Sequence, residues 1–281
     1  MTQSIESNIW KVYVMKALRW FLLIMPIIVL FYQENGLSMT EVILLQSIFS
    51  IAIISFEIPS GYFADVVGRK PSIIVGSFLG FLGFLIYSFS FGFWGFLLAE
   101  VIMGLGASFI SGAESAILYD SLAQVKKENQ YKRIEGKLIS IGNFSEGIAG
   151  IVGGFLATIS LRTPVYFETA VTFLAIPVAF TLIEPARHKF QDPDGNFKGI
   201  LKIVKYSMHG HPEIKWVIIY SSLISAATLT SVWFFQPYFK LIGLPLVLFG
   251  VTWAVLQFSV GIFSIYAHKF EETLGRKKSL I

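Results

Sequence analysis

Long apolar runs alternate with polar loops along the whole chain. A run of about 20 apolar residues is long enough to cross the hydrocarbon core of a bilayer as a helix. Eight such runs cover residues 10–32, 41–60, 71–90, 93–118, 138–159, 164–183, 214–236 and 245–267. Four of the connecting loops are very short, so neighbouring helices must be antiparallel. The pattern therefore predicts an all-α, polytopic membrane protein with about eight transmembrane helices.

The composition favours the same class. Hydrophobic residues make up 54% of the chain and charged residues 14%, whereas a soluble domain has about 25% charged residues. The chain contains no Cys, which excludes a disulfide scaffold and a thiolate metal site. The first apolar run is interrupted by Lys16 and Arg19 and lacks a small-residue cleavage site, so we expect no cleavable signal peptide.

Basic residues gather on one side of the predicted membrane. The N-terminal stretch and the loops at 61–70, 121–137, 184–215 and 268–281 hold 19 of the 22 Lys and Arg residues, whereas the opposite loops hold only Arg162 and Lys240. The positive-inside rule then places both termini in the cytoplasm. We predict a multi-pass protein of the cytoplasmic (inner) membrane. A net charge that comes from such loops gives no reason to expect a nucleic-acid partner.

A ten-residue segment at 61–70, between the second and third runs, reads G-Y-F-A-D-V-V-G-R-K. A second copy, altered at several positions, follows 207 residues later at 268–277. The residues that it keeps include an acid and a Gly-Arg-Lys triplet: Glu272, Gly275, Arg276 and Lys277. Gly36-Leu37 and Gly243-Leu244 repeat at the same spacing. An internal repeat of this kind indicates that the chain consists of two related halves.

The first copy resembles the loop between the second and third helices of transporters of the major facilitator superfamily, whose pattern is G-x-x-x-D-x-x-G-R-K. The matching residues are Gly61, Asp65, Gly68, Arg69 and Lys70. The resemblance covers the whole chain as helices 1 to 8 of a twelve-helix plan. It implies that helices 9 to 12 are absent, because the sequence is a fragment, the gene is truncated or another chain supplies the rest.

The resemblance also implies an organisation in three parts. These are a six-helix N-terminal half at 1–183, a cytoplasmic central loop at 184–212 and a partial C-terminal half at 213–281. Within the loop, basic residues at 198–209 alternate with apolar residues at helical spacing. This pattern predicts a basic amphipathic helix on the inner leaflet, and a solvated linker is the alternative.

The motif implies a conformational latch at the cytoplasmic end. In the superfamily the Asp of the motif faces the start of a helix in the second half, and the Arg pairs with an acid at the end of helix 4. Asp120 is the matching acid here. Gly61 and Gly68 are expected to permit a tight turn. A plain surface loop with positive-inside charges is the alternative, which the ten-residue match and its second copy disfavour.

Ionisable residues inside the apolar runs cost roughly 2.5–3.5 kcal/mol each on insertion scales, so they usually have a functional or a pairing role. The runs contain Arg19, Glu57, Glu100, Glu114 and Glu146. Arg19 shares a helical face with Tyr13, Lys16 and Trp20, and this face would point into a polar cavity. The alternative is that Lys16 and Arg19 extend to the cytoplasmic headgroups.

Three of the acids are candidate proton carriers. Glu100 opens a stretch that resembles the R-x-x-Q-G-x-G-A-A of helix 4, but the Arg is replaced by Glu, so the role proposed for that Arg does not carry over. Glu114 is the second candidate or a structural partner of Arg19. Glu146 ranks first because it lies near the middle of its run, close to Asn143, on a glycine-rich helix.

The glycines of that fifth run are similar to the antiporter motif of superfamily exporters. The motif ends in G-P-x-x-G-G, whereas residues 149–154 read A-G-I-V-G-G. The alternative is that these glycines serve only close helix packing. The motif therefore gives the exporter interpretation limited support.

The resemblance implies a secondary active transporter that moves a small solute by alternating access, and we predict proton-coupled efflux of drug-like or amphipathic compounds. The alternatives are uptake of a metabolite such as a sugar and a truncated membrane protein that does not transport. We expect no enzyme, cofactor or metal site. The expected partners are a small-molecule solute, protons and the lipid bilayer, and the oligomeric state is not predicted. The expected cavity residues are Trp20, Gln46, Asn143, Ser225, Thr228, Trp233 and Gln257.

Overall fold

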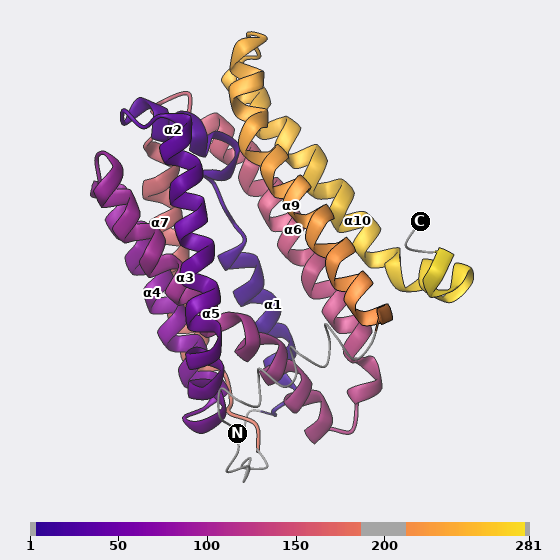
Figure 1. The fold of residues 1–281 in the computed structure, drawn as a ribbon. Helices are drawn as coiled ribbons and strands as arrows, with labels where there is room; N and C mark the ends of the chain where they lie inside the picture. Colours follow the sequence, from indigo (N-terminus) through magenta and orange to yellow (C-terminus); the bar gives the residue numbers. More distant parts are fainter. Residues whose placement is uncertain (1–3, 187–211, 279–281) are drawn as a thin grey trace.

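The computed structural model describes residues 4–186 and 212–278, and in this part of the chain every regular element is a helix (Figure 1). The elements in the first half are α1 (Ser7–Arg19), η1 (Met25–Ile27), α2 (Ile28–Glu34), α3 (Met39–Val66), α4 (Arg69–Phe89), α5 (Phe93–Gln124), η2 (Glu128–Gln130), α6 (Tyr131–Leu156) and α7 (Thr163–Thr181). The elements in the second half are α9 (Pro212–Leu241) and α10 (Leu246–Lys278).

Seven of the described helices are long and apolar enough to cross a membrane, namely α3, α4, α5, α6 with the preceding η2, α7, α9 and α10. This confirms the predicted all-α, polytopic architecture. The prediction of one continuous helix over residues 10–32 is wrong. Residues 20–24 are not helical, and they separate α1 from η1 and α2. We call this stretch the helix-1 break.

The physical reason for the break lies partly in the chain and partly outside it. Pro26 follows the stretch and has no backbone N–H, so the helix cannot form its regular bond at that residue. Glu168 of α7 supplies an acceptor for the freed N–H of Ile24, at 3.0 Å. The apolar pattern of residues 10–32 does not reveal this second partner, which lies far away in the sequence.

The helices form two buried apolar clusters, one at each end of the bundle. The Gly36 end contains the loops at 35–38, 90–92 and 157–162, and its cluster includes Phe31 and Phe96 together with Trp233 and Phe249 of the second half. The Gly68 end lies at the opposite ends of the same helices, and the buried members of its cluster all lie between Val12 and Leu182. Among the described residues, the two halves thus share an apolar core at the Gly36 end only.

Helix α10 packs along α6 through paired glycines (Figure 1). A Cβ atom built on Gly250 would lie 2.2 Å from the carbonyl oxygen of Gly150, and one on Gly154 would lie 3.0 Å from the Cα of Gly250. Backbones this close leave no room for side chains. Three of the glycines that resemble the antiporter motif, Gly147, Gly150 and Gly154, therefore serve close helix packing in this structure.

Two residues that flank α7 form hydrogen bonds with the backbone at the two ends of α4. Glu184 accepts hydrogen bonds from the N–H groups of Arg69 and Lys70, at 2.9 and 2.7 Å, and so satisfies donors at the N-terminus of α4. Arg162 donates to the carbonyls of Ser88 and Ser90, at 2.9 and 3.0 Å, at the C-terminus. Each charge has the sign that the dipole of α4 favours. Burial lowers the pKa of Arg162 from its ordinary value, but an Arg side chain stays protonated in proteins.

The backbone carries the 207-residue repeat. Gly36 and Gly243 have φ of 86° and 71°, and Gly68 and Gly275 have φ of 148° and 75°. Each of these two glycines of the first half thus has an equivalent glycine 207 residues later that also has a positive φ. The side chains of Glu272, Arg276 and Lys277, and the amphipathic helix predicted at 198–209, lie outside the described structure.

Candidate solute cavity

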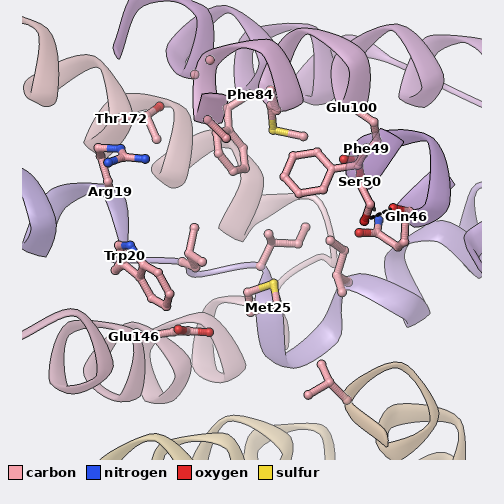
Figure 2. A pocket seen from close by; sticks show the side chains of 18 of the residues that line it. Arg19, Trp20, Met25, Gln46, Phe49, Ser50, Phe84, Glu100, Glu146 and Thr172 are labelled. Atoms are coloured by element: carbon pink, nitrogen blue, oxygen red, sulfur yellow. Dashed lines mark hydrogen bonds between the residues drawn. The ribbon is translucent and has the colours of Figure 1, made fainter. Parts of the chain in front are cut away.

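A cavity of about 830 Å³ lies between the two halves and is lined mostly by aromatic and aliphatic side chains. Its walls come from the helix-1 break, α3, α4, α5, α6, α7, α9 and α10. The large apolar residues that line it include Trp20, Phe49, Phe81, Phe84, Met103, Trp233 and Trp253. Figure 2 shows Glu100 and Glu146 on opposite sides of this space, with Arg19 and Trp20 at its edge.

Six of the seven residues expected to line a cavity do so: Trp20, Gln46, Ser225, Thr228, Trp233 and Gln257. Asn143 is not among the lining residues. Its side chain donates to the carbonyl of Ile139 in its own helix, at 2.8 Å, and it lies beside Gly261 of α10. Asn143 therefore belongs to the α6–α10 contact rather than to the cavity wall.

The helix-1 break brings a non-helical backbone segment to the cavity. Trp20, Leu22 and Ile24 line the cavity, whereas Leu23 points its carbonyl toward α6. A Cβ atom on Gly153 would lie 1.9 Å from that carbonyl oxygen, so only glycine leaves room for the segment at this point. The glycine-rich sequence of α6 thus supports the break as well as the packing of α10.

Glu168 stabilises the break from the other side. The residue is fully buried in α7, and its Oε2 accepts the N–H of Ile24 at 3.0 Å. Within the described residues its Oε1 is buried without a hydrogen-bond partner. Glu168 is not among the acids expected from the sequence, although it also is a charged residue inside an apolar run.

Glu100 lies at the centre of a buried group of neutral donors. The hydroxyl of Tyr32 donates to its Oε1 at 2.5 Å, Gln46 Nε2 donates at 3.0 Å and the hydroxyl of Tyr87 lies at 3.1 Å. The two tyrosine hydroxyls also hydrogen-bond to each other. These donors come from α2, α3 and α4, so Glu100 joins three helices around the cavity wall.

Glu146 lies on α6 and faces the second half. The indole Nε1 of Trp253 donates to its Oε1 at 3.2 Å, and Gln257 is a further hydrogen-bond donor. Both donors belong to α10 and both line the cavity. Glu146 and Glu168 are close enough to repel each other electrostatically when both are charged. The cavity lining therefore has two buried carboxyl groups, Glu100 and Glu146, whose donors are neutral.

Glu114 differs from these acids because it is paired with two cations. Its Oε1 lies 3.2 Å from Arg19 Nη1 and its Oε2 lies 3.3 Å from Lys16 Nζ. Lys16 also lies over the ring of Trp20, 4.7 Å from the centroid. Lys16 and Arg19 of α1 thus pair with α5 inside the protein. Arg19 still lines the cavity, because its side chain remains partly exposed.

The charged residues of the first motif copy meet at the Gly68 end. Arg69 forms an ion pair with Asp65, and its Nε lies 3.6 Å from Asp120 Oδ2. Gly68 has a positive φ and separates α3 from α4. Gly61 does not form the expected turn, since it lies inside α3 with open space beside it. Lys70 contributes its backbone N–H to Glu184.

No group of three or more His, Cys, Asp or Glu residues with metal-binding geometry occurs in the described part of the chain. The polar chemistry of the cavity is carried by the isolated carboxyl groups and by the Arg19 guanidinium. The arrangement can bind and release protons and can hold an organic solute against aromatic surfaces.

Comparison with known proteins gives one family. The family model described as Major Facilitator Superfamily matches residues 10–281. An uncharacterized MFS-type transporter of Methanocaldococcus jannaschii, MJ1560, is 26% identical over 162 residues, which cover 57% of this chain and 41% of that protein. The quinolone resistance protein NorA of Staphylococcus aureus is 25% identical over 161 residues, which cover 57% of this chain and 40% of NorA.

A solved structure shares the fold. The crystal structure of the nucleoside transporter NupG matches with a TM-score of 0.76 at 14% identity, over 95% of this chain and 69% of that chain. At this identity the likeness concerns the fold alone. The aligned part of the chain spans about two fifths of the length of the curated relatives that it matches.

Proposed function

Because the chain belongs to the major facilitator superfamily, we propose that it exports drug-like, amphipathic compounds in exchange for protons. The observation that carries the proposal is the cavity of about 830 Å³, with aromatic walls and with carboxyl groups held by neutral donors. Aromatic and aliphatic walls suit the apolar body of an amphipathic solute. A carboxyl group without a cation beside it can attract a positively charged end of the same solute.

The relative NorA supports a drug-like substrate class. Its name assigns that protein to quinolone resistance, and the proposal extends this activity class to the present chain. The main alternative is uptake of a small metabolite such as a sugar. A sugar would need hydrogen-bonding groups over most of its surface, whereas most of the side chains that line the cavity are apolar; the polar ones include Gln46, Ser50, Ser225, Thr228 and Gln257.

The proposed orientation places the Gly68 end in the cytoplasm of a cell bounded by the cytoplasmic (inner) membrane. The support is the excess of Lys and Arg in the loops at this end and in both terminal segments. The apolar core that joins the halves then lies at the outer end. A cavity closed outside by this core corresponds to a state that faces the cytoplasm.

Proton coupling is proposed to use Glu146 first. Glu146 faces the second half and lines the cavity, so its surroundings change when the halves move. Glu100 is second, and Glu168 joins the candidates because one of its oxygens is unpartnered among the described residues. Glu114 ranks last, since its two ion pairs give it a structural role that protonation would disrupt.

The latch is proposed to act at the Gly68 end. Asp65, Arg69 and Asp120 lie together there, and a motion that separates α4 from α5 at this end would break the contact between Arg69 and Asp120. Asp65→Asn and Arg69→Ala are therefore expected to slow transport and leave membrane insertion intact, because both side chains lie at the polar end of the bundle.

The test uses purified protein in proteoliposomes with ethidium as the fluorescent amphipathic cation. A pH gradient should drive ethidium accumulation, and a protonophore should abolish it. Glu146→Gln should abolish accumulation driven by the gradient but preserve exchange of ethidium for ethidium. Normal accumulation in the Gln variants of Glu100, Glu146 and Glu168 would exclude all three carriers. The uptake alternative would be favoured if the wild-type protein neither accumulated nor exchanged ethidium but took up labelled sugars.

A further inference from the structure

One side chain of the second half completes the hydrogen bonding of helix 1. Gln236 of α9 is 2% exposed. Its Oε1 accepts the backbone N–H of Val29 at 2.8 Å, and its Nε2 donates to the carbonyl of Met25 at 2.8 Å. In a regular α-helix these two backbone groups would bond to each other, because Val29 lies four residues after Met25. The Gln236 amide thus takes the place of one intrahelical bond.

The position of this contact follows from the internal repeat. Val29 and Gln236 are 207 residues apart, which is the spacing of the repeat. The contact therefore joins equivalent positions of the two halves.

Both hydrogen bonds of Gln236 lie beside the apolar cluster of the Gly36 end. Trp233, one turn before Gln236 on α9, is buried in the apolar cluster of the Gly36 end, beside residues of α2. A buried donor or acceptor that loses its partner in such surroundings is costly. If α9 moved away, Val29 and Met25 would have to bond to each other, and helix 1 would gain a turn.

We propose that Gln236 holds the cavity closed at the Gly36 end by substituting for the Met25–Val29 bond of helix 1. In the closed state the second half supplies both hydrogen bonds. In the open state the amide withdraws and the two backbone groups bond directly, so no buried group stays unpaired. This inference rests on the proposed transport by alternating access, and it adds the positioning residue that links opening of the cavity to the shape of helix 1.

The test measures opening by thiol labelling, because the sequence has no Cys. A reporter is introduced as Ser50→Cys, at a cavity-lining position of α3. A membrane-impermeant, charged maleimide is added from the side of the Gly36 end. Gln236→Met keeps the length of the side chain and removes both hydrogen bonds. We expect labelling of the reporter to be roughly tenfold faster, which corresponds to about 1.4 kcal/mol.

Two further variants show whether faster labelling is specific to loss of the Gln236 hydrogen bonds. Gln236→Asn keeps the amide but is one methylene too short to reach both groups, so it should accelerate labelling in the same direction. Ser231→Ala is the matched control on α9, because its hydroxyl bonds only to Ala227 of its own helix, and it should label at the original rate. Gln236→Asn also decides the question if Gln236→Met does not fold.

Unchanged labelling in a folded Gln236 variant would overturn the inference. Equal acceleration in Ser231→Ala would overturn it as well, since the effect would then belong to α9 in general. The labelling needs no solute and no pH gradient, so it separates the two proposals. Faster labelling without ethidium transport would reject the proposed substrate class and keep the role of Gln236.

Discussion

Helix 1 and α9 are equivalent in the repeat, yet they differ in structure. Helix 1 is divided into α1, the break at 20–24, η1 and α2, whereas α9 is one helix from Pro212 to Leu241. The residues of α9 that correspond to the break are 227–231, and all are helical. Trp233 occupies the position that corresponds to Pro26. The same place in the fold thus accepts both a broken and a continuous helix.

The comparison shows that proline alone does not break these helices. Pro59 lies inside α3, Pro177 inside α7 and Pro237 inside α9, and each helix continues through its proline. What distinguishes the helix-1 break is a set of partners from other helices. Glu168 accepts the N–H of Ile24, Gly153 makes room for the Leu23 carbonyl, and Gln236 replaces the Met25–Val29 bond directly after the break. Tertiary contacts therefore decide where the helix ends.

The largest effect is expected when the space for the break is removed. Gly153→Ala places a Cβ where the Leu23 carbonyl oxygen lies, only 1.9 Å away, and overpacking of this kind costs about 1–3 kcal/mol. Thermal unfolding in detergent measures the loss. The control is Gly112→Ala, because a Cβ on Gly112 meets nothing within 4 Å. Equal losses in both variants would contradict the role of Gly153.

A loss of up to the same size is expected when the acceptor of the break is removed. Glu168→Leu leaves the buried N–H of Ile24 without its acceptor, and a buried unsatisfied group costs about 1–3 kcal/mol. Glu168→Gln keeps a carbonyl acceptor at the same place and should lose less. The comparison of the two melting curves is the measurement. If the Gln variant were as unstable as the Leu variant, the charge rather than the acceptor would be the stabilising feature.

Making helix 1 more like α9 is expected to change stability little. Pro26→Ala restores the backbone N–H that Trp233 has at the corresponding position of α9. Because Glu168, Gly153 and Gln236 remain, we expect the break to persist and stability to change by less than about 1 kcal/mol. Hydrogen exchange of the amides at 20–26 would detect rewinding. A protected, continuous helix in this variant would show that proline is the main cause of the break.

The smallest effect is expected in α9 itself. Ser231 corresponds to Ile24 in the repeat, but α9 is continuous there and the Ser231 hydroxyl bonds to its own helix. Ser231→Ala should therefore change stability by less than about 0.5 kcal/mol, as exposed substitutions away from special contacts do. A larger loss in thermal unfolding would indicate that this part of α9 has an unidentified partner.

The sequence predicts the spans well because hydropathy and length are local properties. The runs that became α3 to α7 and the first part of α10 appear directly in the pattern of apolar residues. The helix-1 break could not be predicted in this way, because Glu168 lies 144 residues from the N–H that it accepts. Pro26 was visible but not decisive, as the continuous helices with internal prolines show.

The sequence shows which residue types belong to the candidate site, but not which of these residues contact each other. An acid inside an apolar run is visible in the sequence, and six of the seven expected cavity residues line the cavity. Which acid Arg19 meets depends on how α1 packs against α5, and the structure places Glu114 there. The donors around Glu100 come from three different helices, so their convergence depends on the packing of the whole first half.

The paired capping of α4 has a consequence for chain length. Arg162 and Glu184 flank α7 and reach opposite ends of its antiparallel neighbour. Inserting one residue into α7 would rotate one flank against the other by about 100° and lengthen the helix by about 1.5 Å. One of the two contacts would then be lost. Arg162 and Glu184 therefore fix the number of residues between positions 162 and 184. Insertions are expected to be tolerated in the loops but not inside this helix.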